Sequence, residues 1–415
     1  MRTTLRNASL ILTALAVLAA VGAACGPGGH KSRVHIEDVP VTQKLTLTGL
    51  SSQVDILRDE YGRPHVYAHD PIDAARASGW LQAEDRMIQL DLLRRLGSGT
   101  LAELVGAVAP EAAQEDAYLR AVGLRRAAQE SYDAAPQYEK DLAQAYADGV
   151  NAKIATFTTF PAPEYAVFGV LPADIEPWTP LDSLVVSKVF AFNLNWDGGT
   201  ELALADGKER LDAAFPTGPR AGSTADLIFP FLPPETVSIV NPSLAGSMVM
   251  QLVRPEITWN ARPSRASLEG ARHTAWQLEH SRWNPFGKKK GVFGDRGSNN
   301  WVVSGAKTAS GHPIVCNDPH LSLDAPPIWY PMHLNTEKYG GSLNVEGVSV
   351  VGAPGVTLGG NGKVAWAFTN TNPDTTDVYL EKYSLGTGTN GVDQVMWDAD
   401  GPGGAAPALV NLVKD

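Results

Sequence analysis

The stretch Gly297-Ser298-Asn299-Asn300-Trp301-Val302-Val303-Ser304-Gly305 decides the fold expected for this chain. A glycine precedes a serine, and an apolar, β-branched run typical of a strand follows at once. If the Gly297–Ser298 bond is cut, Ser298 becomes an N-terminus with both a hydroxyl nucleophile and an α-amine base. That amine titrates at about 7.7–8.0, so it can accept a proton at neutral pH. Taken alone, the run favours the simpler interpretation, a glycine-serine turn before a strand.

The composition is that of an ordinary globular protein. The 415 residues are 44% hydrophobic and 19% charged, enough for one large core or two domains. The net charge of −11 argues against non-specific binding to nucleic acid and against a polybasic hold on an anionic membrane. The two cysteines, Cys25 and Cys316, exclude a disulfide framework and a zinc site built from a cysteine cluster.

Residues 1–25 read as an export signal. Two arginines precede an apolar run, Leu10 to Val21, and small residues lead to Cys25. The glycine-rich residues after Cys25 are typical of a bacterial lipoprotein junction, with Cys25 lipidated and residues 26–40 as a flexible tether. Plain secretion is the alternative. Either way the sequence predicts an exported protein of the periplasm or outer envelope, with membrane contact only through a lipid anchor.

Residues 41–254 form a helix-rich region. Short strands are expected at Val54–Leu57 and His65–Ala68, followed by a long helix that Asp70 caps and Pro71 begins. Pro136 opens another helix. Thr179, with Pro180 next and Asp182 three residues on, is a capped start for a third.

Residues 255–297 differ in character, with scattered polar residues, a lysine cluster and weak periodicity. They predict a surface spacer or a removable propeptide. Residues 298–415 are strand-rich, and we expect strands at Trp301–Ser304, His312–Val315, Val348–Val351, Val364–Thr369 and Val378–Glu381.

Several blocks together resemble a known family. In order they are Arg58–Ala68, Gln82–Arg86, Arg94-Arg95, Tyr146–Ala152, Gly297–Trp301, Asn317–His320 and Gly359–Trp366, then Thr369 and Asp374–Glu381. Each block is a weak signal, and their joint order and spacing is a strong one. The chain is similar to the penicillin amidase (penicillin acylase) family of N-terminal-nucleophile hydrolases over roughly residues 40–200 and 298–385.

The resemblance implies an exported precursor that cuts itself before Ser298, loses a spacer and remains a heterodimer of its two subunits. The implied fold is α+β, a four-layer αββα arrangement, and it is incomplete at the C-terminus because family second subunits are several times longer. Ser298 matches the nucleophile, and Gly297 the residue whose carbonyl is attacked during processing. His320 matches a residue that positions the nucleophile; the simpler reading is a turn histidine after Pro319. Asn370 matches a position whose backbone N–H stabilises the oxyanion.

The resemblance also implies a structural calcium ion between the subunits. Glu201 matches the first-subunit ligand, and Asp374, Thr376 through its carbonyl and Asp377 match the others. All four are oxygen donors, as a hard cation requires. The alternative is that these acids cap turns and helix ends.

The function expected is hydrolysis of a small linear acyl amide through an acyl-enzyme on Ser298. The alternative is a non-catalytic envelope lipoprotein or binding module, derived from the same family by truncation. Two other motifs are not expected to be functional. The run Ser304–Lys307 fits the S-x-x-K motif of penicillin-recognising serine enzymes, but that motif must open a helix and here follows a strand. Asp398–Gly401 resembles the start of a calcium-binding loop but lacks the later glutamate ligand. His65 and His69 lie across a strand and turn, so metal binding by this pair is not expected.

Overall fold

A computed structural model describes residues 36–195, 202–203, 206–207, 210, 214, 268–273, 297–321, 325–370, 383–384, 394–397 and 408–411. The chain divides into two compact units, Met1–Thr48 and Gly49–Asp415. The described part of the first holds one short 3-10 helix, η1 (Ile36–Asp38). None of the helices in the described ranges combines the length and apolar character needed to cross a bilayer.

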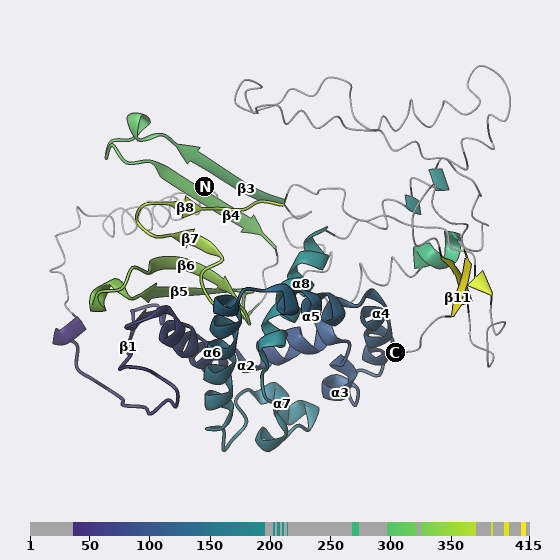
Figure 1. Ribbon diagram of the computed structural model, residues 1–415, viewed down its shortest axis with the longest axis horizontal. Helices are drawn as coiled ribbons and strands as arrows, with labels where there is room; N and C mark the ends of the chain where they lie inside the picture. The colour runs from purple at the N-terminus through teal and green to yellow at the C-terminus, as the bar shows by residue number, and fades with distance from the viewer. Residues whose placement is uncertain are drawn as a thin grey trace, which may run out of the picture. The chain divides into compact units, whose positions relative to one another are not determined.

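The α-helices of the second unit come mainly from its first half (Figure 1). They are α2 (Pro71–Ser98), α3 (Leu101–Val105), α4 (Ala112–Val122), α5 (Leu124–Ala134), α6 (Gln137–Ile154), α7 (Pro163–Phe168) and α8 (Pro180–Asn195). Short 3-10 helices lie at η2 (Pro172–Asp174), η3 (Gly305–Lys307) and η4 (Glu337–Tyr339).

A six-stranded sheet joins the two halves of the sequence in the order β1-β2-β5-β6-β7-β8. Its strands are β1 (Asp55–Arg58), β2 (Pro64–Tyr67), β5 (Trp329–Asn335), β6 (Asn344–Val350), β7 (Leu358–Gly360) and β8 (Ala365–Trp366). All neighbours are antiparallel except β2 and β5, which pair in parallel. Strands from before and after Ser298 therefore share one hydrogen-bonded sheet.

The remaining strands form two smaller sheets. β3 (Gly297–Val303) and β4 (Ile314–His320) are an antiparallel hairpin, and β9 (Tyr383–Ser384), β10 (Gln394–Trp397) and β11 (Ala408–Asn411) form a three-stranded sheet. Mixed helix and sheet make the described fold α+β, as expected from the sequence.

Helix α2 begins where its sequence predicts. The Asp70 carboxylate accepts the backbone N–H of Asp73, and Pro71 occupies the first turn, where no N–H donor is needed. The helix ends at Gly99, whose left-handed backbone (φ 65°) favours glycine. At the start of α8 the cap runs in the opposite sense: the Thr179 backbone N–H and hydroxyl both donate to the Asp182 carboxylate, three residues further along the chain.

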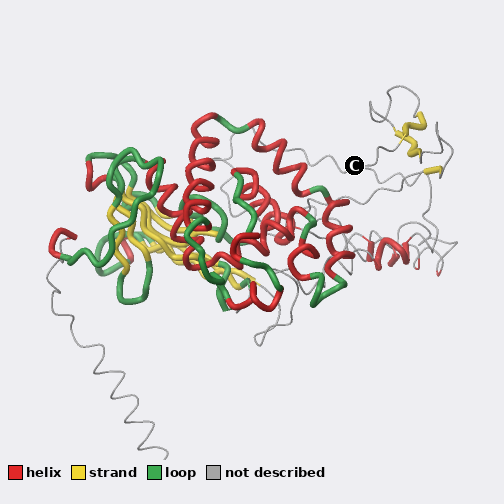
Figure 2. Tube along the Cα trace, turned by 90° about the horizontal axis from the view of Figure 1, so that it is seen from below, coloured by secondary structure: helices red, strands yellow, loops and turns green. Residues whose placement is uncertain are grey.

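The main core lies between α2 and one face of the six-stranded sheet. Val66 on β2 and Met332 and Leu334 on β5 alternate with half-buried neighbours, so one face of each strand is buried. Leu81 and Leu90 of α2 belong to the same buried cluster. Figure 2 shows the main group of strands, in yellow, gathered beside the helices.

Helices α2 and α6 approach closely because each carries a glycine at the contact. A Cβ at Gly79 would collide with the Tyr146 carbonyl oxygen, and a Cβ at Gly149 with that of Arg76. Backbone atoms cannot move aside as a flexible side chain can.

We expect Gly149→Ala to destabilise the fold by about 1–3 kcal/mol, because the added methyl group overpacks the α2–α6 contact. Urea unfolding followed by circular dichroism measures the change. Ala152→Gly on the same helix is the control for helix propensity alone and should cost about 1 kcal/mol or less. A Gly149→Ala protein as stable as the wild type would show that the two helices do not meet at this glycine.

The expected strands differ from the observed ones after Ser298. The predicted strand His312–Val315 is observed as Ile314–His320, and Val364–Thr369 shortens to Ala365–Trp366. Strand β4 belongs to a two-stranded sheet, in which proline is tolerated more readily than in a central strand, and the observed strand includes Pro319 and His320. The simpler reading of His320 as a turn residue is therefore wrong. Val378–Glu381, Asp398–Gly401 and most of the spacer 255–297 lie outside the described residues.

Candidate active site

Ser298 is the second residue of strand β3 and directly follows Gly297. The register pairs Gly297 with His320 and Ser298 with Pro319. Both strand ends are thus held by the same antiparallel ladder, which fixes the backbone on either side of the Gly297–Ser298 bond. A nucleophile at this place is carried by a regular strand, which positions it better than a free loop end would.

The two faces of the hairpin carry different groups. Paired residues share a face and successive residues alternate, so Ser298 and Pro319 lie on one face and His320 on the other. His320 Nε2 is 2.7 Å from an Asp318 carboxylate oxygen on that second face. In the uncut chain the register therefore places the Ser298 and His320 side chains on opposite faces of the hairpin. The role of His320 in positioning the nucleophile stays a prediction.

Asn370 lies at the end of a described segment that follows β8. Its side-chain amide donates to the Leu194 carbonyl at the C-terminal end of α8. Two residues earlier, the backbone of Phe368 is bonded to the β3–β4 hairpin through Asn317. The segment 367–370 thus connects the hairpin that bears Ser298 to α8.

The other predicted site residues cannot be placed. Cys25 and the expected calcium ligands Glu201, Asp374, Thr376 and Asp377 lie outside the described residues. Within the residues that are described, no three or more His, Cys, Asp or Glu side chains gather as a metal site would need. Ser304 caps the 3-10 turn η3, with its hydroxyl accepting from Ala306, so the S-x-x-K run opens no α-helix.

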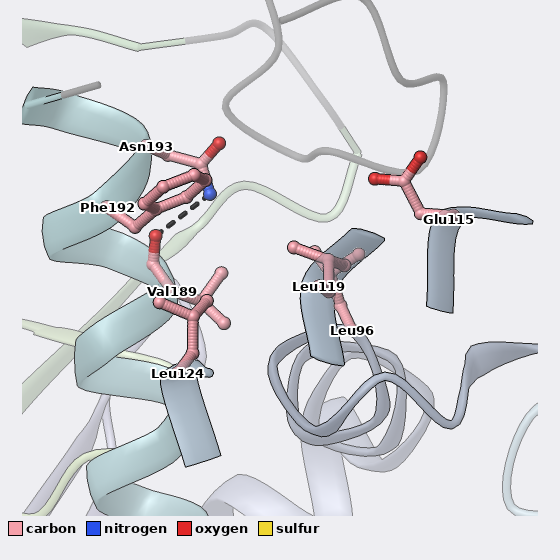
Figure 3. A pocket seen from close by; sticks show the side chains of 7 residues that line it. All are labelled: Leu96, Glu115, Leu119, Leu124, Val189, Phe192 and Asn193. Atoms are coloured by element: carbon pink, nitrogen blue, oxygen red, sulfur yellow. Dashed lines mark hydrogen bonds between the residues drawn. The ribbon is translucent and has the colours of Figure 1, made fainter. Parts of the chain in front are cut away.

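A small, mostly apolar pocket lies beside α8 (Figure 3). Its walls come from α2, α4, α5 and α8, and the lining residues are Leu96, Glu115, Leu119, Leu124, Val189, Phe192 and Asn193. Asn193 donates to the Val189 carbonyl, so its side chain is turned back along the helix. Ser298 is not among the lining residues.

Comparison with known proteins identifies the family. The model of the penicillin amidase family matches residues 53–398. The chain belongs to the penicillin amidase family. Penicillin acylase 2 proenzyme from Pseudomonas sp. (strain SE83) is 30% identical over 370 residues, which are 87% of this chain and 42% of that protein. Acyl-homoserine lactone acylase QuiP from Pseudomonas aeruginosa is 31% identical over 374 residues, 88% of this chain and 39% of that one.

Among solved structures, a thermostable penicillin G acylase from Alcaligenes faecalis matches with 27% identity and a TM-score of 0.38. The match covers 46% of this chain and 97% of that one. The chain spans about two fifths of the length of the curated penicillin amidase relatives it matches.

The penicillin amidase block around Gln82 has a structural role that sequence reasoning missed. Gln82 is fully buried, and its Oε1 accepts from the Tyr146 hydroxyl at 2.8 Å and from the Gly352 backbone N–H at 2.9 Å. One amide thus joins α2, α6 and the turn after β6. Asn151 has a similar role: its Nδ2 donates to the Trp178 carbonyl, and its Oδ1 accepts the Trp178 backbone N–H.

The acidic and basic residues of the same block tie the two halves of the chain together. Asp85 accepts from the Tyr330 hydroxyl at 2.6 Å and from the Arg58 guanidinium. Burial, and then the Asp85 charge, raise the pKa of Tyr330 well above its ordinary value. Arg86 donates to the Pro327 carbonyl at 2.8 Å. Asp85 and Arg86 are adjacent on α2, and both bind residues in the second half of the sequence.

His65 and His333 form a pair on the half-buried face of the sheet. Their Nδ1 atoms are 3.1 Å apart and their ring centroids 5.2 Å, so the two nitrogens point at each other. This separation and orientation are those of a nitrogen–nitrogen hydrogen bond. Asn344 donates to Glu337 and so turns its Oδ1 to His333 Nε2. His333 Nδ1 is then the acceptor and His65 Nδ1–H the donor.

The histidine pair predicts a fall in stability on acidification. Burial, and then the neighbouring His333 charge, lower the pKa of His65 below its ordinary 6.5. The unfolded chain therefore binds a proton first, so the free energy of unfolding falls as the pH drops below about 6.5 and towards the lowered pKa. Urea unfolding between pH 5 and 8 measures this loss.

His65→Asn keeps a donor near the Nδ1 position and cannot titrate, so its stability should depend less on pH. His312→Asn, on the exposed tip of the β3–β4 hairpin, is the matched control and should keep the wild-type slope. Equal slopes for wild type and His65→Asn would contradict the assignment.

Proposed function

We propose that this chain belongs to a self-processing amidohydrolase that cleaves linear acyl amides with Ser298 as an N-terminal nucleophile. The observation that carries the proposal is the position of Ser298, at the beginning of a hydrogen-bonded strand and directly after glycine. Cleavage before Ser298 leaves the new N-terminus on a strand that β4 still holds. The membership of the penicillin amidase family supports the same chemistry.

Processing uses the serine that later performs catalysis. The Ser298 hydroxyl attacks the Gly297 carbonyl carbon, the Gly297–Ser298 C–N bond breaks, and an ester forms between Gly297 and the Ser298 oxygen. Water then hydrolyses the ester, which releases Gly297 as a carboxylate and Ser298 as a free amine. Glycine suits this step because its backbone tolerates strained conformations that other residues resist.

Hydrolysis of a substrate then follows in two stages. The Ser298 hydroxyl attacks the acyl carbon while the α-amine of the same residue takes its proton, directly or through water. The amine passes the proton to the leaving nitrogen, the C–N bond breaks, and an acyl ester of Ser298 remains. Water activated by the same amine attacks this ester and releases the acid.

The negative charge that develops on the acyl oxygen needs hydrogen-bond donors. The backbone N–H of Asn370 is the donor proposed here, and losing one such donor typically costs about 100- to 1000-fold in rate. His320 is proposed to orient the nucleophile, which requires it to leave Asp318 once the new N-terminus is free. Both roles rest on the resemblance described for these positions.

The two products of the cut are proposed to stay together as a heterodimer in a four-layer αββα fold. Three contacts support the association, since each joins residues from before Gly297 to residues after Ser298. They are the β2–β5 ladder, the Gln82–Gly352 hydrogen bond and the Asp85–Tyr330 hydrogen bond.

A calcium ion is proposed as a structural clamp between these subunits. Glu201, Asp374, Thr376 and Asp377 supply carboxylate and carbonyl oxygens, the donor set that calcium prefers. The proposed location is the periplasm or outer envelope, reached through the export signal of residues 1–25 and with Cys25 as the lipidation site.

The substrate class comes from the relatives. One is called a penicillin acylase proenzyme and the other an acyl-homoserine lactone acylase, so an amide between an acyl chain and a small amine is the class proposed. Which acyl group fits depends on the pocket around the nucleophile.

Intact-mass spectrometry of the purified chain, combined with a panel of penicillins and acyl-homoserine lactones, tests the proposal. Two masses, the second starting at Ser298, that co-elute in native size-exclusion chromatography and release acid from a panel member are the expected result. A single uncut mass with no hydrolysis would contradict the proposal and favour a non-catalytic binding module.

A further inference from the structure

Asn317 makes a two-way bond to the backbone of Phe368. Its Oδ1 accepts the Phe368 N–H at 3.2 Å, and its Nδ2 donates to the Phe368 carbonyl at 3.0 Å. The same Nδ2 also lies 3.2 Å from the Asn299 carbonyl. One side chain thus ties a segment 51 residues later in the chain to the hairpin. An amide that satisfies both backbone groups of one residue imitates a strand pairing.

This bond lies on the face of the hairpin that carries Ser298. Asn317 pairs with Asn300, and Ser298 pairs with Pro319, so all four share one face of the pleat. His320 and Asp318 lie on the other face. The segment that Asn317 holds is therefore brought to the side of the nucleophile and away from His320.

The far end of the same segment has its own attachment. Asn370, two residues after Phe368, donates through its side chain to the Leu194 carbonyl on α8. The backbone from Phe368 to Asn370 is thus held at one end by the hairpin and at the other by a helix. Two attachments so close together leave the amide between them little freedom to move.

We propose that Asn317 is a positioning residue for oxyanion stabilisation, because it sets where the Asn370 backbone N–H lies relative to Ser298. This inference rests on the proposed function. Asn317 itself touches no reacting atom in this role. It acts through Phe368, whose backbone it fixes on the nucleophile's face.

The chemistry requires asparagine in particular. Alanine loses all three hydrogen bonds. Aspartate keeps the acceptor for the Phe368 N–H but sets a carboxylate against the carbonyl oxygens of Phe368 and Asn299, which repel it. Both changes release the segment, so aspartate should not restore what alanine removes.

Kinetics of the processed protein test the positioning. We expect Asn317→Ala and Asn317→Asp to lower kcat about 100-fold, the loss that a misplacement of about 1 Å by a mutation away from the reacting atoms can cause. KM should stay within about twofold, because substrate binding does not use the oxyanion donor. Rates are normalised to the cut fraction measured by intact mass. Asn300→Ala, an exposed amide on the same face, is the matched control and should keep the wild-type kcat.

Hydrogen exchange gives a readout that does not need activity. The Phe368 amide should exchange about fivefold faster in Asn317→Ala, because its acceptor is lost, and at the wild-type rate in Asn300→Ala. Unchanged exchange, an unchanged kcat, or an equal kcat loss in Asn300→Ala would each overturn the inference. An inactive wild-type chain would instead contradict the proposed function, while the exchange rates would still decide whether Asn317 holds the segment.

Discussion

Ser298→Ala is expected to leave the chain uncut at Gly297 and to remove amide hydrolysis. The variant lacks the oxygen that attacks the Gly297 carbonyl, and it lacks the nucleophile that forms the acyl-enzyme. Loss of a catalytic nucleophile lowers kcat by roughly 10⁶-fold in a well-studied serine hydrolase, and we expect a fall of about the same size here. Intact mass and product release measure the two effects separately.

Two further variants sharpen this prediction. Ser298→Cys retains a nucleophile and should still be cut, because a thiol can attack the same carbonyl. Ser304→Ala removes the serine of the S-x-x-K run and should change neither processing nor hydrolysis. A Ser298→Ala chain that is still cut at the same bond would refute self-processing by Ser298.

Asp91→Ala is expected to destabilise the fold by about 3–5 kcal/mol, because it removes the buried carboxylate that pairs with both Arg94 and Arg95. The Asp91 side chain is 1% exposed. It accepts from Arg94 Nε at 2.8 Å, from Arg95 Nε at 3.0 Å and from the Tyr165 hydroxyl at 3.2 Å. Because the position is almost fully buried, water cannot readily take the place of the carboxylate as a partner for the two arginines. Urea unfolding at neutral pH measures the change.

The control for Asp91→Ala is Asp133→Ala on α5. Asp133 accepts from Gln129 on the exposed surface, so its loss should change the free energy of unfolding by about 0.5 kcal/mol or less. A loss below about 1 kcal/mol for Asp91→Ala would mean that the network is not held at Asp91. The remaining partners, Asp182 for Arg94 and two glutamates, Glu103 and Glu176, for Arg95, would then be sufficient.

The parts of the fold that follow from local sequence were predictable. Asp70 with Pro71, and Thr179 with Asp182, mark helix starts because the capping group lies within three residues of the N–H that it binds. Strand β4 was predicted too short, because the pairing of Asn317 to His320 depends on β3 and leaves no apolar alternation in its own sequence.

The site could be predicted only in part, for the same reason. Gly297-Ser298 is visible as a local pattern, and the family blocks point to Asn370. The roles of Gln82 and Asn317 depend on partners far away in the sequence, Gly352 and Phe368, which no periodicity relates to them. An uncharged amide residue inside a family block is the one sequence signal that could have drawn attention to either.

The central claim is that Ser298 carries the acyl group as an N-terminal nucleophile. The most direct measurement is peptide mapping of the protein after acid quenching during turnover of a slow acyl amide. We predict a peptide that begins at Ser298, carries the acyl mass and loses it to hydroxylamine, as an ester of the serine oxygen should. An acyl group on a different peptide, an acyl mass that resists hydroxylamine, or a Ser298 still joined to Gly297 would contradict the account.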